Sequence, residues 1–591
     1  MKIKLLNQPM CDSATEQILL NRGILPADFH HYLNTTDADI NNPLLFGEIY
    51  LKQAAAALIK SVSLNKKALV LVDCDCDGYC SAALLINYLH DLFPTWVESK
   101  LTWFIHSGKQ HGLSDVDLKN YADYGLFLIP DASSNDYDYH QTLSNMGVDI
   151  IILDHHEAPY ISPNAITINN QLSDYPNKHF CGTGVTWQFC RYLDDLLGYK
   201  YADNYRDLVA LANTADMMDI REFETKHLIV DGFRDQNIHN PFIKGIAEKN
   251  AFTLGPKINS IGAAFYIAPF VNAMVRSGEM EEKEILFNSM INHLASQKIP
   301  STKRGHKPGE MESVVMQALR TATNVKNRQT RIEEVALEKL ENLIEERDLL
   351  SHKVLMFLLK PGQVDRNVAG LVANRIMGKY QRPVCMLTRV EETAADGSVK
   401  VTYQGSARGC DLAGVSNFKD ICEATGLTEW QTGHQGAFGL SLPEENIEEF
   451  LSRTDIVLAD MTSEPIYYVD YIYNDSAVET QNILDIAMLD DLWGQNMPEP
   501  YVAVKGLKIK KDMVTVYTKK DLTLKITLPN RVSIMLFKAS PELCDKLQNQ
   551  NTGYVVMDLV GRCNKNVWNG FVSAQIMIKD YEIVGETKWN F

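Results

Sequence analysis

The sequence predicts a multi-domain α/β protein with a helical start, a parallel sheet, a long connecting helix, a second α/β region and a strand-rich tail. The chain has 591 residues, which at roughly 100–200 residues per domain corresponds to about three to five domains. Short apolar runs alternate with helical segments in the first half, which is the pattern of βαβ units around a parallel sheet. After residue 460, strand-like runs follow one another at the spacing of a small barrel.

Composition and charge exclude several classes of protein. The 45% of hydrophobic and 22% of charged residues are ordinary for a globular chain. No apolar run approaches the ~18 residues of a membrane span, and no apolar signal segment follows Met1, so we expect a cytoplasmic protein without membrane contact. The 11 cysteines are an odd number and contain no CxxC pair, so they suggest neither a disulfide framework nor a structural zinc site. A net charge of −18 argues against broad non-specific phosphate binding, so we expect any nucleic-acid contact to be local or mediated by metal.

Five regions follow in order. The first is rich in strong helix formers and is predicted to be helical. The second contains four apolar strand candidates, at 68–72, 126–129, 149–153 and 166–168. The third ends in an amphipathic helix suited to bridging two domains, in which Ile332, Ala336, Leu340 and Leu343 repeat at helical spacing. The fourth is a second α/β region and the fifth is a small β-barrel. Their predicted bounds are 1–65, 66–278, 279–350, 351–458 and 459–591.

The strongest chemical signal is a set of three carboxylates at alternate positions after an apolar strand. Asp73, Asp75 and Asp77 follow the run 68–72 and precede Gly78 and a helix of small residues. Three anions this close repel one another unless cations or water neutralise them. The pattern therefore predicts a metal site, and the alternative is a solvated acidic turn.

A second signal lies after the run 149–153, where His155 and His156 follow the strand. Ligands of open α/β sheets bind beyond the carboxyl ends of the strands, so we expect this segment and the acidic triplet to face one site. Imidazole beside carboxylates favours Mn²⁺ or a similar ion over Ca²⁺. Asp131 and Asp216 also follow apolar segments, although either residue alone is equally typical of a strand or helix cap.

These motifs resemble those of the DHH phosphoesterase superfamily, and most closely those of the RecJ single-strand-specific exonucleases. Residues 73–78 match a DxDxDG motif, residues 154–156 match the DHH triplet, and Asp131 matches the intervening aspartate. Matching motifs occur in matching order over roughly residues 15–445. The remaining segments resemble the LVALGTVAD, IAPRLNAAGR, SAR and GGHxxAAG motifs, at 208–216, 267–276, 405–409 and 433–439.

The resemblance implies a site for two divalent cations, Mn²⁺ or Mg²⁺. One cation would be held by Asp73, Asp75 and Asp131. The other would be held by Asp77, Asp131, His155 and Asp216. Two such ions, roughly 3.5–4 Å apart, hold both the nucleophile and the leaving oxygen of a phosphodiester. The implied catalytic residues are His156, Arg276 and Asp131. The implied substrate-binding residues are Lys109, Asn272, Ser406, Arg408 and His434, the last three for a terminal 5′ phosphate.

Three positions depart from the family pattern. Lys109 stands where RecJ proteins have an Arg, so the charge is kept and the bidentate fork is lost. Phe438 replaces an Ala, and residues 367–373 only approximate a GVVGIVA turn. These departures bear on substrate preference more than on the reaction.

The tail carries lysines interleaved with aromatic residues, which is typical of an OB-fold that binds single strands. The alternative is that the lysines protect edge strands and that the aromatic residues belong to the core. The RecJ resemblance favours an OB-like domain that binds DNA. The residues concerned are Lys505, Lys508, Lys510, Lys511, Lys519, Lys520, Lys525, Tyr517, Phe537, Trp568 and Phe571.

The sequence thus predicts a metal-dependent 5′-to-3′ single-stranded DNA exonuclease with a two-metal mechanism, of the kind used in DNA repair and recombination. The substrate would be 5′-phosphorylated single-stranded DNA. A single-strand-binding protein or a helicase remains open as a protein partner, and no oligomeric state is predicted. One alternative is a DHH phosphodiesterase for oligoribonucleotides or cyclic dinucleotides. Another is a non-catalytic DHH scaffold, which would have lost carboxylates that this chain retains.

Overall fold

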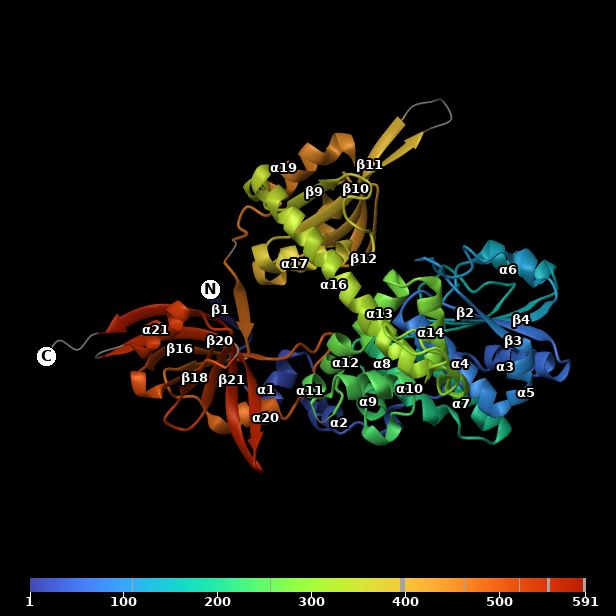
Figure 1. The fold of residues 1–591 in the computed structure, drawn as a ribbon, viewed down its shortest axis with the longest axis horizontal. Coiled ribbons are helices and arrows are strands. Elements are labelled where there is room, and N and C mark those ends of the chain that lie inside the picture. The colour runs from blue at the N-terminus through green and yellow to red at the C-terminus, as the bar shows by residue number, and fades with distance from the viewer. Residues whose placement is uncertain are drawn as a thin grey trace. The chain divides into compact units, whose positions relative to one another are not determined.

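The computed structural model describes residues 1–108, 110–255, 257–393, 399–462, 464–519, 521–549 and 553–587 (Figure 1). The chain divides into two compact units. Unit I consists of Arg22–Asn327 and Leu489–Glu499. Unit II consists of Met1–Asn21, Arg328–Met488 and Pro500–Phe591. Within the described ranges, no helix is both long enough and apolar enough to span a membrane.

Unit I is built on a five-stranded parallel sheet in the order β3-β2-β4-β5-β6. The four strands predicted from the apolar runs are confirmed. From β2 the chain passes to β3 on one side of the sheet and then to β4 on the other side. The carboxyl ends of β2 and β4 therefore form a topological switch point, where such sheets bind ligands. The strands are β2 (Lys67–Val72), β3 (Leu101–Ile105), β4 (Tyr124–Pro130), β5 (Asp149–Asp154) and β6 (Ile166–Asn169).

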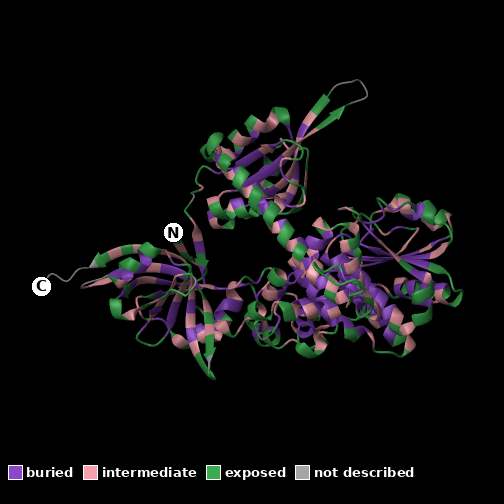
Figure 2. Cartoon of the chain, in the orientation of Figure 1, coloured by how far each residue is buried: buried purple, intermediate pink, exposed green. Residues whose placement is uncertain are grey.

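The sheet is buried on both faces, which explains why its strands read as continuous apolar runs. On one face, alternate residues such as Leu69, Phe127 and Ile150 form a core with Leu143 of α6 (Tyr137–Asn145). Helices α4 (Cys76–Leu92) and α7 (Gly182–Leu197) also pack against the strands. In Figure 2 the buried residues are concentrated in these strands and in the surrounding helices.

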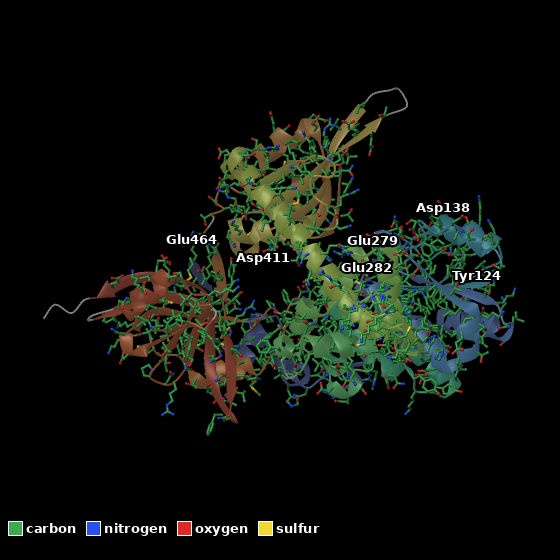
Figure 3. The ribbon with its side chains drawn as sticks, viewed as in Figure 1. Tyr124, Asp138, Glu279, Glu282, Asp411 and Glu464 are labelled. Carbon is green, nitrogen blue, oxygen red and sulfur yellow. The ribbon has the colours of Figure 1, made fainter. Side chains whose placement is uncertain are left out.

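Helices fill the rest of unit I. The long, almost wholly buried α4 packs against α7 and α8. Helix α14 begins with a capping box in which Glu282 accepts a hydrogen bond from the backbone N–H of Glu279 at 2.9 Å (Figure 3). The remaining elements are α2 (Phe29–Leu33), α3 (Glu48–Ser63), α5 (Pro94–Lys100), α8 (Arg206–Ala215), α9 (Phe223–Gly232), α10 (Pro241–Lys249), α11 (Ala251–Leu254), α12 (Ser260–Tyr266), α13 (Ala268–Ser277), α14 (Met280–Met290), α15 (Asn292–Ala295), β7 (Lys298–Pro300) and β8 (Met311–Ser313).

A late segment of the chain, Leu489–Glu499, belongs to unit I and is called the strap here. Its Trp493 and Met497 are buried. Lys257 pairs with Asp491 at 2.5 Å, and the Asn496 amide donates to Asp219 at 2.7 Å. The strap falls inside the region 459–591 that the sequence assigns to one domain, so part of that region packs with the parallel sheet's unit.

The first half of unit II is the second α/β region. Its five-stranded sheet has the order β12-β13-β11-β10-β9, and only β9 and β10 pair in parallel. The predicted long helix is α16 (Val314–Glu346), and its Ala336, Leu340 and Ile344 pack against β9 and α17. The other elements are β9 (Leu355–Leu359), β10 (Val384–Thr393), β11 (Val399–Arg408), β12 (Trp430–His434), β13 (Ala437–Pro443), α17 (Ala369–Tyr380), α18 (Phe418–Ala424) and α19 (Ile447–Val457).

The tail of unit II forms a seven-stranded sheet in the order β15-β16-β20-β21-β19-β18-β17. The predicted strand-like runs are β16 to β19, and a long antiparallel pair, β20 and β21, completes the sheet. The N-terminal segment, predicted to be helical, also supplies a strand, β1, which pairs in parallel with β14. The elements are β1 (Lys2–Leu5), α1 (Ala14–Asn21), β14 (Ile466–Val469), β15 (Tyr471–Asn474), α20 (Thr480–Ala487), β16 (Tyr501–Ile509), β17 (Val514–Tyr517), β18 (Thr523–Thr527), β19 (Ser533–Phe537), α21 (Pro541–Gln548), β20 (Tyr554–Trp568) and β21 (Phe571–Thr587).

The contact between α8 and α9 predicts the effect of a glycine substitution. A Cβ atom on Gly232 would overlap the carbonyl oxygen of Arg206 and lie 2.8 Å from Ala210 Cβ. Because backbone cannot move aside cheaply, Gly232→Ala should destabilise unit I by about 1–3 kcal/mol. Thermal unfolding followed by circular dichroism measures this loss.

Gly378→Ala is the matched control. Gly378 lies on the exposed side of α17 with no atom within 4 Å of the added Cβ, so alanine should stabilise the helix by about 0.5–1 kcal/mol. Equal shifts of the melting temperature in the two variants would contradict the packing argument.

Candidate active site

The acidic residues predicted from the sequence meet at the switch point of the unit I sheet. Asp73 follows β2 and Asp131 follows β4, while His155 follows β5 and Asp216 follows α8. Their ligand atoms form overlapping groups, and within each group the atoms lie within 4.8 Å of one another. These groups are Asp73, Asp75 and Asp131, then Asp77, His155 and Asp216, and then Asp131, His155 and His156. The structure thus brings together all six residues predicted to hold metal.

Two helix N-termini orient two of the three carboxylates of the acidic triplet. Asp75 caps α4, and its Oδ1 accepts the backbone N–H of Gly78 at 3.0 Å. Asp77 accepts the backbone N–H groups of Gly182 at 2.7 Å and Thr183 at 2.9 Å, at the start of α7. The partial positive charge of a helix N-terminus stabilises a carboxylate placed there. The fold therefore fixes both side chains before any cation is present.

Asp131 occupies a strained and crowded position. Its φ of 64° lies in the left-handed region, and its backbone N–H donates to Leu153 at 2.8 Å. A Cβ atom on Gly182 would lie 2.6 Å from Asp131 Cβ, so only glycine fits opposite it. Asp131 Oδ1 is buried, and among the described residues it forms no hydrogen bond. A buried carboxylate oxygen without a donor is an acceptor suited to a cation.

His155 links the acidic residues of the site. Its Nε2 lies 3.3 Å from Asp131 Oδ1, 3.5 Å from Asp216 Oδ2 and 3.8 Å from Asp77 Oδ2. Burial lowers the pKa of His155, which favours the neutral imidazole. Neutral imidazole is the form that binds a metal ion, so this side chain suits the ligand role.

The crowded carboxylates raise one another's pKa values. Burial, followed by the negative charges of Asp77 and Asp75, raises the pKa of both Asp131 and Asp216 well above the usual range. Burial and the charges of Asp77 and Asp73 also raise the pKa of Asp75. The site therefore carries electrostatic repulsion that bound cations would relieve, and its donor set fits divalent ions that accept oxygen and imidazole ligands.

His156 points to solvent from the same motif. Its side chain is 54% exposed, and its Nδ1 lies 2.7 Å from Asp154 Oδ1. Asp154 is fully buried and also accepts the backbone N–H of Ser134 at 3.0 Å. Although burial alone lowers it, the hydrogen bond with Asp154 raises the pKa of His156 to about 9. Asp154 thus holds a cationic imidazolium beside the acidic cluster.

The sequence analysis did not identify His111 as a site residue. Its Nδ1 lies 2.7 Å from Asp73 Oδ2, and the hydrogen bond with Asp73 raises the pKa of His111 to about 11. Lys283 on α14 holds the preceding loop, because its Nζ donates to the carbonyl of Ser107 at 2.7 Å. The only sequence signal was a histidine before Gly112. Lys109, predicted to bind substrate, lies outside the described residues.

Two more predicted residues lie on α13. Asn272 lines a cavity beside α8, and its Oδ1 is buried without a hydrogen-bond partner among the described residues. Arg276 is one helical turn further along and is exposed. Because residues four apart share a face of a helix, both side chains lie on the same side of α13.

The other predicted substrate-binding residues lie in unit II. Arg408 of β11 and His434 of β12 both stand opposite Ala437 of the intervening β13, and Ser406 stands opposite Gly439. Arg408 is half-buried beside the first turn of α17. A Cβ atom on Gly370 in that turn would collide with its guanidinium group and lie 3.7 Å from Ser406 Oγ. A guanidinium group, a hydroxyl group and a helix N-terminus together suit a phosphate.

Comparison with known proteins identifies two regions of the chain and its relatives. A family model described as the DHH family, N-terminal domain, matches residues 67–213, and one described as the RecJ OB domain matches residues 469–580. The chain is 31% identical to a protein named as a single-strand DNA-specific exonuclease, YorK of the SPbeta prophage in Bacillus subtilis. That match covers 96% of this chain and 95% of the relative. RecJ of Bacillus subtilis is 23% identical, with 99% and 72% covered.

A solved structure shares the fold. The crystal structure of RecJ in complex with Mn²⁺ from Thermus thermophilus covers 98% of this chain and 79% of its own, with a TM-score of 0.68 and 20% identity. The predicted α/β class with a DHH domain and an OB domain is therefore confirmed. Together with the near full-length match to a relative above 30% identity, this shows that the chain belongs to the RecJ-like single-strand DNA-specific exonucleases of the DHH family.

Proposed function

We propose that this exonuclease requires two divalent cations, Mn²⁺ or Mg²⁺, and degrades single-stranded DNA from the 5′ end. The observation that carries the proposal is the pair of ligand groups at the switch point of the unit I sheet. RecJ of Thermus thermophilus, which shares the fold, has been solved with Mn²⁺ and with Mg²⁺. An OB domain in the tail favours this activity over hydrolysis of cyclic dinucleotides, which need no surface to guide a strand.

The residues would divide into two overlapping ligand sets. Asp73, Asp75 and Asp131 would hold one cation. Asp131 would be shared, and the second cation would also use Asp77, His155 and Asp216. When bound, two such cations activate water and neutralise charge that develops on the leaving oxygen. Loss of any of these carboxylates would indicate a non-catalytic scaffold, and all of them are present.

The positive side chains around the cluster would act on the substrate. Asp154 holds His156 through Nδ1, and as a cation His156 would bind a non-bridging phosphate oxygen or protonate the leaving oxygen through its other ring nitrogen. Arg276 would bind the same phosphate, because an exposed guanidinium forms paired hydrogen bonds with phosphate oxygens. Asn272 would position the nucleotide from the neighbouring turn of α13.

The second candidate site would give the enzyme its polarity. Ser406, Arg408 and His434 converge on β13 beside the first turn of α17. This arrangement would bind the terminal 5′ phosphate of the strand, which bears more negative charge than an internal phosphodiester.

The tail would bind the strand further along. In the tail, Lys508 of β16 is exposed, and so are Lys510, Lys511 and Lys519 in the connections between strands. Tyr517, Phe537 and Phe571 are also exposed, as bases stacking on them would require. Lys505 and Lys525 are partly buried. Lys520 and the side chain of Trp568 lie outside the described part of the tail.

Metal binding should be measurable as stability. A cation that binds only the folded state adds about 2.7 kcal/mol at a concentration one hundred times its dissociation constant. Adding Mn²⁺ or Mg²⁺ should therefore raise the melting temperature of the wild type, measured by differential scanning fluorimetry. In Asp131→Asn, which keeps a side chain tolerant of the left-handed backbone, the increase should be largely lost.

Asp138→Asn is the control for this experiment, because Asp138 is exposed on α6 (Figure 3) and belongs to none of the candidate ligand groups. Its melting temperature should respond to metal as the wild type does. An equal response in Asp131→Asn would exclude Asp131 as a ligand.

Activity should depend on the same residue and on strand polarity. With Mn²⁺ or Mg²⁺, the wild type should release the label of 5′-labelled single-stranded DNA in its first cleavage events. The label of 3′-labelled DNA should be released only at the end of degradation. Asp131→Asn should be slower by about a thousandfold or more, because metal stabilisation of the transition state contributes several kcal/mol. Release of the 3′ label first would overturn the proposed polarity, and full activity of Asp131→Asn would overturn the two-metal mechanism.

Arg408→Ala should separate the two kinds of strand end. The variant should lose about 10- to 100-fold in kcat/KM on 5′-phosphorylated strands, because a charged hydrogen bond contributes about 1.5–3 kcal/mol, and much less on strands with a 5′ hydroxyl. Arg453→Ala, which removes an arginine paired with Glu449 on α19, is the matched control. If Arg408→Ala slows both substrates equally, the residue does not read the terminal phosphate.

A further inference from the structure

A cavity of about 340 Å³ in unit I is lined by Ala215 and Met217, the residues on either side of Asp216. None of the six predicted metal ligands lines it. It lies between the end of α8, helices α12 and α13, and the strap. None of its lining residues is acidic, basic or a histidine. A neutral cavity beside a strongly charged site indicates a ligand part that is itself neutral, which excludes a phosphate group.

Large apolar side chains line the cavity and remain open to solvent. Met217 is 59% exposed and Phe265 is 66% exposed, and Met218 and Ile261 lie beside them. Met217 directly follows Asp216 and has a φ of 56°, a conformation that is costly for a methionine. Strained residues concentrate at binding sites, and an aromatic ring with flexible thioethers suits a flat heterocycle of any sequence.

Two polar groups in the cavity wall lack partners. Thr214 Oγ1 and Asn272 Oδ1 are both buried, and no hydrogen-bond partner is found for either within the described ranges. Thr214 lies two residues before Asp216, and Asn272 lies on α13. An otherwise apolar cavity with a few such groups is typical of a site that orients a small heterocyclic ligand.

The strap closes one side of the cavity through Gly494 and Gln495. The backbone N–H of Ile220 donates to the Gln495 carbonyl at 3.3 Å, and the Asn496 amide donates to Asp219 at 2.7 Å. These bonds fix the loop that carries Met217 and Met218. The cavity is therefore a formed feature of unit I, and the late segment of the chain helps to build it.

We propose that this cavity receives the base of the nucleotide whose phosphate lies at the acidic cluster. The proposal rests on the proposed function, since it assumes a DNA strand at that cluster. Asp216 follows α8 and belongs to the cluster, and the next residue, Met217, lines the cavity, so the two adjoining sites suit the phosphate and the base of one nucleotide. Phe265 would stack on the base. Asn272 Oδ1 would accept a hydrogen bond from its edge, and the Thr214 hydroxyl would donate or accept one.

The test combines loss of the base with loss of the aromatic ring. Single-stranded DNA carrying one abasic nucleotide, placed in turn at each of the first positions from the processed end, is compared with intact DNA. For the wild type, the abasic nucleotide at one position should lower kcat/KM about tenfold, as should Phe265→Ala on intact DNA. In Phe265→Ala the abasic nucleotide should add little further loss. Independent, multiplying losses would overturn the proposal, and so would wild-type insensitivity at every position.

Phe252→Ala is the matched control, because Phe252 is fully exposed on α11 and does not line the cavity. It should behave as the wild type. Because Phe265 is itself exposed, its truncation leaves no void in the core, and an unchanged melting temperature verifies that the variant is folded.

A binding measurement distinguishes failure of this proposal from failure of the proposed function. The probe is the 5′-monophosphate of 2-aminopurine deoxyriboside with Mg²⁺, whose fluorescence is quenched when its base stacks. Wild type and Phe252→Ala should quench it, and Phe265→Ala should not. Absence of hydrolysis by the wild type would refute the proposed function, whereas absence of quenching by the wild type would refute the base site whether or not the enzyme cleaves DNA.

Discussion

The main physical constraint on unit I is the repulsion among five aspartates that lie together at one edge of its sheet. These are Asp73, Asp75, Asp77, Asp131 and Asp216. Burial and mutual charge raise the pKa of Asp75, Asp131 and Asp216, so the fold bears a cost that ordinary packing would avoid. The N-termini of α4 and α7 offset part of this cost by donating backbone N–H groups to Asp75 and Asp77. Bound cations would relieve the remainder, so the same repulsion would link the stability of unit I to the proposed metal-dependent catalysis.

Close backbone approach makes this crowding feasible. Asp131 has a left-handed φ, and Gly182 stands where any side chain would displace it. Met217 beside Asp216 has a second left-handed backbone conformation. Such strain persists only where the surrounding structure outweighs it, and here strands β2, β4 and β5, which lead into the site, are buried on both faces. The apolar core of the sheet thus supports a geometry that the site residues would not adopt alone.

Much of the fold and of the acidic cluster could be predicted because the sequence patterns that indicate them are local. Apolar runs such as 149–153 mark strands, and the carboxyl ends of parallel strands meet, so Asp73, Asp131 and His155 were expected together. The contact of His111 with Asp73, the packing of the strap in unit I and the pairing of β1 with β14 join segments far apart in sequence. No periodicity records such contacts, since only the folded chain creates them. The predicted domain bounds remain predictions.

The net negative charge of the chain favours binding of DNA through several small sites. A net charge of −18 repels a polyanion at long range, so each contact must supply its own local attraction. At the acidic cluster this would come from cations together with His156 and Arg276. In unit II it would come from Arg408 and from the lysines of the tail. A neutral cavity for the base suits the same arrangement, because stacking on Phe265 attracts a nucleotide without depending on charge or on salt.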